Sequence, residues 1–134
     1  MSSKMRSLNG YKKVQVNTSS PEKLLLMVYG GAIKFLKKAR LLAKKDLRHK
    51  ANVYILKAIA ALVELIATLN HDESPEIAGA LKKLYVYAME QLRQSINEDN
   101  IEGIDEAINI LSQLKSSWEE AFSSQDSSTL QMTG

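Results

Sequence analysis

Residues 19–45 read SSPEKLLLMVYGGAIKFLKKARLLAKK, and they predict a long helix with a well-marked start. Pro21 is acceptable in the first turn because the N–H it lacks would be unpaired there, and Glu22 stands three residues after a serine, as in a capping box. Basic residues between 37 and 45 suit the negative end of a helix dipole. This stretch therefore predicts a helix that spans about Pro21–Lys45.

Three further helices follow from similar signals. The second is predicted over about 46–69, and Ser74-Pro75-Glu76 repeats the start signal for a third that ends near Ile96. Asp99, with an acid three residues later, opens a fourth that runs to about Phe122. Only two prolines and six glycines occur, and they fall where helices begin or break rather than at hairpin spacing.

These elements predict an all-α fold, an antiparallel up-down four-helix bundle with short connections. The bundle domain spans 1–122, with 1–19 as an N-terminal cap segment and 20–122 as the four helices. Residues 123–134 are polar and rich in serine, so they cannot bury enough apolar surface to become ordered and are predicted to form a disordered tail.

Composition and motifs argue against several classes of protein. The 134 residues contain no cysteine, which excludes disulfide scaffolds and thiol chemistry, and no stretch is apolar enough for stable membrane insertion. His49 and His71 lack a second histidine at metal-ligand spacing, and no nucleophile or phosphate-binding motif is present. We therefore expect neither an enzyme nor a cofactor, and the absence of a signal peptide predicts a cytoplasmic location.

The net charge of +3 conceals two halves of opposite sign. Residues 1–67 hold 14 of the 18 Lys and Arg with three acids, whereas 68–134 hold four bases and 12 acids. The basic half can face the acidic half within the bundle, which is the simpler interpretation. The alternative is a nucleic-acid-binding module that uses a set of cations along the first two helices: Lys34, Lys37, Lys38, Lys44, Lys45, Arg48 and Lys50.

The second predicted helix is apolar around nearly its whole circumference. From Val53 to Leu69 only three residues are polar, and they share one narrow wedge of the helical wheel. If one set of apolar residues faces the core (Ile55, Ile59, Leu62, Ile66 and Leu69), a second set remains outside it: Tyr54, Ala58, Ala61 and Leu65. The first helix shows a milder excess, in Leu26, Met27, Ile33 and Leu41.

Two explanations fit this excess of apolar surface. The chain's own ends or a second copy can cover it, as in a structural homodimer, or it can form a groove for an apolar segment of another protein. Tyr11, Val14 and Val16 alternate with polar residues just before a firm helix start, so we expect them to pack over such a groove.

The sequence resembles the flagellar secretion chaperone family over about Tyr11 to Phe122. The resemblance rests on apolar and aromatic patches in the family's order, ending in a single late tryptophan: Tyr11, Val14 and Val16, Ser20–Tyr29, Gly31-Ala32, Phe35-Leu36, Leu62–Leu65, Leu69, Glu76–Ala78, Leu81, Leu84-Tyr85, Leu111, Leu114 and Trp118–Ala121. One departure is Gly30, where the family usually has an aspartate.

The resemblance implies a cytoplasmic helical bundle that binds the C-terminal segment of flagellin. It implies that the chaperone prevents premature polymerisation and delivers flagellin to the export gate. Because such a client folds as it binds, it needs a long apolar track rather than one deep pocket. The predicted partner-binding residues are the N-terminal and leftover apolar positions: Tyr11, Val14, Val16, Leu26, Met27, Ile33, Leu41, Tyr54, Ala58, Ala61 and Leu65.

Overall fold

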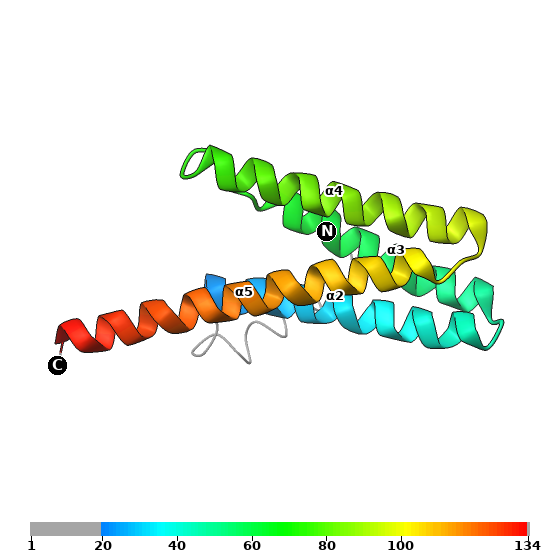
Figure 1. The fold of residues 1–134 in the computed structure, drawn as a ribbon, viewed down its shortest axis with the longest axis horizontal. Coiled ribbons are helices and arrows are strands. Elements are labelled where there is room, and N and C mark those ends of the chain that lie inside the picture. The colour runs from blue at the N-terminus through cyan, green and yellow to red at the C-terminus, as the bar shows by residue number, and fades with distance from the viewer. Residues whose placement is uncertain (1–19, 134) are drawn as a thin grey trace, which may run out of the picture.

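A computed structural model describes the backbone of residues 20–133 and the side chains of residues 20–125. The described residues form four helices, which are α2 (Pro21–Lys44), α3 (Arg48–Ala67), α4 (Pro75–Glu98) and α5 (Glu102–Thr133). The predicted antiparallel up-down four-helix bundle is confirmed, and successive helices pack side by side with α5 returning to α2 (Figure 1). The predicted N-terminal cap segment lies outside the described residues.

Most predicted helix starts are confirmed, and each has a local physical reason. The Ser20 hydroxyl accepts a hydrogen bond from the Lys23 N–H at 3.2 Å, and Pro21 begins α2. The predicted start of the last helix at Asp99 is wrong. Asp99 instead has a left-handed backbone with φ of 53° and ends α4, and the side chain of Asn100 accepts from the Gly103 N–H at 3.3 Å.

The last helix is longer than the sequence predicted. α5 continues to Thr133, so the end predicted near Phe122 is wrong, and residues 123–133 have helical backbone where a disordered tail was expected. No glycine or proline occurs between 104 and 133, so nothing in that stretch breaks a helix. The extension carries the end of α5 past the start of α2 (Figure 1).

The core is a column of buried side chains between the four helices. Small alanines alternate with large residues, and two tyrosines lie at its centre. The fully or almost fully buried members are Tyr29, Ala32, Leu36, Ala39, Ile55, Ala58, Leu62, Leu65, Tyr85, Ala88, Leu92, Ile104, Ala107 and Leu111.

The two ends of the bundle differ. At one end, which we call the closed end, the α2–α3 and α4–α5 turns lie together, and Arg48 Nη2 donates to the Asn100 carbonyl oxygen at 3.0 Å. At the other, the open end, the start of α4 diverges from α2 and α5 (Figure 1). Ser74 starts α4 there without a side-chain cap hydrogen bond. The bundle therefore separates toward the start of α2.

Candidate binding surface

An apolar groove runs between α2 and α3 on the outside of the bundle. Its volume is about 590 Å³, and we call it the α2/α3 groove. At Gly31 an added Cβ would meet nothing within 4 Å, so the glycine leaves open space in the wall. The lining residues are Pro21, Leu24, Leu25, Met27, Val28, Gly31, Ala32, Phe35, Lys57, Ala61, Glu64, Leu65 and Thr68.

Lys57, Glu64 and Thr68, the polar residues of α3, lie along this groove rather than on the outermost face of the helix. The Lys57 Nζ lies 5.1 Å from the ring centre of Tyr54 and 5.7 Å from that of Phe35. These distances allow cation–π contacts that hold the lysine stem beside apolar surface. The groove therefore combines an apolar floor with a charged edge.

The outward face of α3 is apolar as well. Val53, Leu56 and Val63 are each more than half exposed, and exposed alanines at 60 and 67 continue the row. Successive members are three or four residues apart, which places them on one stripe of the helix. We call this row the α3 strip.

A shorter apolar row lies on α4. Ile77 is 58% exposed, and Ala80, Leu84 and Tyr87, which follow it at intervals of three and four residues, are also exposed. Ile77 lies at the open end, where the start of α4 diverges from α2 and α5 (Figure 1). We call this row the α4 strip, and like the α3 strip it exposes large apolar side chains along one helix.

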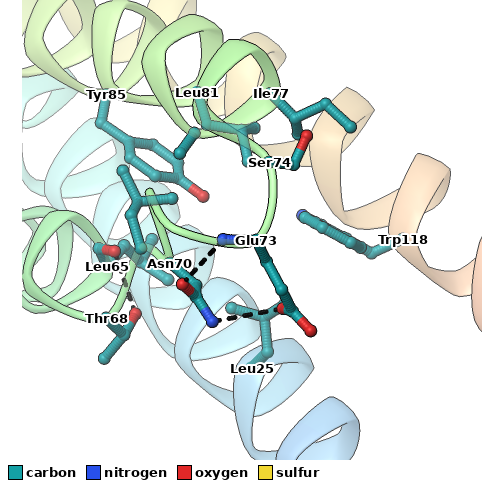
Figure 2. Close-up of a pocket in the computed structure, with 12 residues that line it drawn as sticks. Leu25, Leu65, Thr68, Asn70, Glu73, Ser74, Ile77, Leu81, Tyr85 and Trp118 are labelled. Atoms are coloured by element: carbon teal, nitrogen blue, oxygen red, sulfur yellow. Dashed lines mark hydrogen bonds between the residues drawn. The ribbon is translucent and has the colours of Figure 1, made fainter.

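A second hollow, the end cavity, lies at the open end. It has a volume of about 280 Å³ and is lined by side chains from all four helices and the 70–73 loop (Figure 2). Leu25, Leu65 and Thr68 line both the cavity and the groove. The other lining residues are Leu69, Asn70, Glu73, Ser74, Ile77, Ala78, Leu81, Tyr85 and Trp118.

The loop at the cavity rim is held by its own hydrogen bonds. Asn70 Oδ1 accepts from the backbone N–H of Glu73 at 3.2 Å, and the amide of Asn70 donates to the Glu73 carboxylate at 3.2 Å (Figure 2). These contacts fix the polar side of the rim, while Leu81 and Trp118 contribute apolar parts of the wall. The cavity is thus an apolar space with one polar edge.

A buried hydrogen-bonded cluster lies next to this cavity. The Tyr29 and Tyr85 hydroxyls bond each other, and the indole N–H of Trp118 donates to the Tyr29 hydroxyl oxygen at 3.1 Å. Burial raises the pKa of Tyr29, and its bonds to Tyr85 and Trp118 partly offset this. Burial, and next its bond to Tyr29, raise the pKa of Tyr85. The cluster joins α2, α4 and α5 in the core.

Two ion pairs connect the basic and acidic halves of the chain. Arg40 contacts Asp105, and Arg48 Nε lies 3.6 Å from Asp99 Oδ1. The pairs link the α2–α3 region to the end of α4 and the first turn of α5, as expected if the two halves face each other within the bundle. Neither hydrogen bond nor ion pair joins an acid to Lys34, Lys37, Lys38, Lys44, Lys45 or Lys50 among the side chains described here.

The structure separates the predicted partner-binding residues into groups. Met27, Ala61 and Leu65 line the groove, although Leu65 is only 2% exposed. Leu26, Ile33 and Tyr54 are half-buried, and Leu41 is exposed on α2. Tyr11, Val14 and Val16 lie outside the described residues, so their place on a groove stays a prediction.

The prediction that Ala58 and Leu65 lie on a face outside the core is wrong. Both are buried, together with Ala51, Ile55 and Leu62. On a helical wheel this buried stripe is rotated by about 40° from the one that the sequence predicted. The predicted core stripe lies opposite the polar residues Lys57, Glu64 and Thr68 on the helical wheel. In the structure these three residues line the groove, and the α3 strip is the face that points outward.

The residues of the α3 strip were not predicted as a surface, because their spacing in the sequence is not distinctive. The α3 strip has regular spacing of three and four, but the buried stripe of the same helix has it too, so periodicity does not distinguish them. No cluster of acids and histidines that could hold a metal ion occurs within residues 20–125, and none of the described helices is long and apolar enough to span a membrane.

Comparison with known proteins gives a consistent result. A family model described as flagellar protein FliS matches residues 4–125. A flagellar secretion chaperone of Campylobacter jejuni is 30% identical over 112 residues, covering 84% of this chain and 88% of that protein. One from Vibrio cholerae is 28% identical, covering 85% and 87%, and one from Bacillus subtilis is 27% identical, covering 86% and 85%.

A solved structure supports the fold independently. The crystal structure of a bacterial flagellar chaperone aligns with a TM-score of 0.73 and 21% identity, covering 90% of this chain and 98% of that one. At this identity the likeness concerns the fold alone.

Proposed function

The chain belongs to the FliS family of flagellar proteins, and we propose that it is a cytoplasmic secretion chaperone that binds the C-terminal segment of flagellin. Its relatives are named as chaperones, which indicates a non-enzymatic role. Binding would cover the apolar surface through which flagellin subunits associate, and so prevent premature polymerisation. The loaded chaperone would then deliver its client to the flagellar export gate.

The observation that carries this proposal is the α2/α3 groove together with the exposed α3 and α4 strips. A client that is disordered before binding loses conformational entropy when it becomes ordered. A long apolar interface is needed to offset that cost in free energy. The groove accepts an apolar helix face or an extended segment, and Lys57 and Glu64 at its edge offer charges of both signs. The strips lengthen the path around the bundle.

Calorimetry with the C-terminal segment of about 40 residues from the cognate flagellin tests the proposal. Coupled folding and apolar burial predict a large negative heat-capacity change. Binding should persist or strengthen as a kosmotropic salt such as sulfate is added. No heat at micromolar concentrations would contradict the proposal.

The neighbouring glycines of α2 provide a matched pair of variants. Gly31→Leu would fill the open wall of the groove, whereas an added Cβ at Gly30 lies 3.7 Å from Lys115 Cε, toward α5. We expect Gly31→Leu to weaken client binding at least tenfold and Gly30→Leu to leave it within about twofold. Equal effects of the two variants would argue against the groove as the binding surface.

The N-terminal segment is part of the same proposal. We propose that Tyr11, Val14 and Val16 occupy part of the apolar surface until the client displaces them. Deletion of residues 1–16 should then leave helix content and thermal melting nearly unchanged while altering client affinity severalfold. Collapse of the fold on deletion would count against a removable cap.

The same measurements separate the alternatives. Binding to nucleic acid through the unpaired lysines would weaken steeply as salt rises, because counterions are released. A structural homodimer would bury the α3 strip against a second copy, so sedimentation would show a dimer that Val63→Asp dissociates while flagellin binding stays normal.

A further inference from the structure

The end cavity joins surfaces that would otherwise be separate. It shares Leu25, Leu65 and Thr68 with the α2/α3 groove, and its opposite wall includes Ile77, the first residue of the α4 strip. In Figure 2 the shared residues Leu25, Leu65 and Thr68 lie on one side of the cavity and Ile77 on the other, so the cavity lies between the groove and the start of the α4 strip.

The volume and the lining of the end cavity determine which kind of side chain it can hold. An apolar cavity of about 150 Å³ is known to hold a benzene molecule, so the end cavity, at about 280 Å³, has room for a large side chain. The walls are apolar, and hydrogen bonds already hold the polar groups of Asn70 and Glu73 at the rim. A charged side chain that entered would leave most of its surface against apolar walls, because the polar groups of the lining lie at the rim.

We infer that the end cavity is an anchor site that receives one large apolar side chain of the bound client as the client passes from the groove to the α4 strip. This inference rests on the proposed function, and it adds a site that fixes the client's register. The indole of Trp118 lines the cavity, and its N–H donates to the Tyr29 hydroxyl, which joins α5 to the core. A client side chain in the cavity would therefore contact this indole ring directly.

Filling the cavity from inside tests the inference. Ala78 is almost fully buried in the α4 wall, so Ala78→Leu would occupy the space that the client side chain needs. Gly79→Leu is the matched control, because Gly79 does not line the cavity and an added Cβ there meets nothing within 4 Å. Leu81→Phe fills the same cavity by enlarging an existing side chain, and it replaces Ala78→Leu if that variant does not fold.

Affinity is measured by calorimetry with the C-terminal flagellin segment and with versions in which each large apolar residue is changed to alanine. We expect Ala78→Leu to weaken binding of the unmodified segment by about tenfold to a hundredfold, and Gly79→Leu by less than twofold. One of the client alanine substitutions that weakens binding to the wild-type chain should cause no further loss of affinity for Ala78→Leu. The reason is that the leucine already fills the space into which that client side chain would insert.

Emission from Trp118, the single tryptophan of the chain, gives a second readout. It should shift to shorter wavelength when the client binds the wild-type chain, and shift much less in Ala78→Leu. A folded Ala78→Leu variant that binds with unchanged affinity and couples to no client position would overturn the anchor site and leave the groove proposal intact. No binding by the wild-type chain would overturn the proposed function itself.

Discussion

The closed and open ends of the bundle are built from different interactions. At the closed end, backbone and polar side chains lie in close contact: an added Cβ at Gly103 would lie 2.1 Å from the Gln91 carbonyl oxygen, and Ser95 and Arg48 both donate to the Asn100 carbonyl. At the open end, apolar side chains surround a cavity and Ile77 is exposed.

This difference indicates that one end of the bundle serves mainly stability and the other mainly binding. Close backbone contact leaves little room for movement, so the closed end holds the helices in register. An open apolar surface contributes less to stability because its side chains lack packing partners, but it remains available to bind another chain. Variants that act at one end should therefore affect folding, and those that act at the other should affect binding.

The largest effect is expected at the closed end, from Gly103→Ala. The new methyl group would overlap backbone atoms of Gln91, which cannot rotate away, so we expect a loss of about 3 kcal/mol of unfolding free energy. Urea denaturation measures it. Gly79→Ala is the control, because its Cβ has open space and should gain up to about 1 kcal/mol from helix propensity. Equal stability of the two variants would show that the helices separate easily at Gly103.

The next effect is expected on binding, from Ala61→Glu in the groove. The half-exposed site should tolerate the glutamate with a change in unfolding free energy within about 0.5 kcal/mol. Client binding should weaken by about 1–3 kcal/mol, because the bound client would cut the carboxylate off from water and an ion pair with Lys57, one turn away, would offset only part of that cost. Circular dichroism melts and a client titration measure the two quantities. An unfolded variant would instead place Ala61 in the core.

A pH-dependent effect is expected between the two ends, at the buried tyrosines. Burial raises the pKa of Tyr29 and of Tyr85, so the folded state holds both protons more tightly than the unfolded state. Their contribution is complete below the ordinary tyrosine pKa of about 10 and is lost as pH rises above it, by up to about 1.4 kcal/mol per pH unit for each phenol.

Tyr85→Phe separates this contribution from other alkaline titrations. At neutral pH the variant should lose about 1 kcal/mol with the hydrogen bond to Tyr29. Above pH 10 its stability should fall less steeply than that of the wild type, as measured by urea denaturation at a series of pH values. Parallel pH profiles would mean that Tyr85 ionises without unfolding the bundle.

The smallest effect is expected from Gly30→Asp, which restores the residue usual in the family. The new side chain would lie near Lys115, which now bonds Glu119 at 3.2 Å. An exposed ion pair and a slightly better helix former than glycine together predict a gain of about 0.5 kcal/mol, reduced by added salt. Thermal melts at low and high salt check this. A gain that salt does not reduce would exclude the ion pair.

Much of the fold could be predicted because its signals are local. Ser20 and Pro21 mark the start of α2, and Pro75 that of α4, through hydrogen bonds and backbone angles within one turn. The missed boundaries have local causes as well. Asp99 is as suitable for a left-handed helix end as for a helix start, and the serine-rich stretch after Phe122 has few apolar side chains but also lacks a helix breaker before Gly134.

The candidate site was only partly predictable. Met27 and Ala61 do line the groove, whereas Ala58 belongs to the core and Val63 was not singled out. The end cavity could not be expected from the sequence, since its walls come from all four helices and a loop. Neither Leu25 nor Trp118 has any feature in its own segment that indicates the other.

The sequence by itself determined the four-helix bundle, most of its helix starts and the family, because caps, helix breakers and apolar spacing act over a few residues. Only the tertiary structure decided which stripe of α3 is buried. That helix has one apolar stripe through Ile55 and Leu62 and another through Leu56 and Val63. Apolar spacing fixes how side chains are placed relative to one another around a helix, but the rotation of the helix about its own axis is set by the packing of α2 and α4 against it.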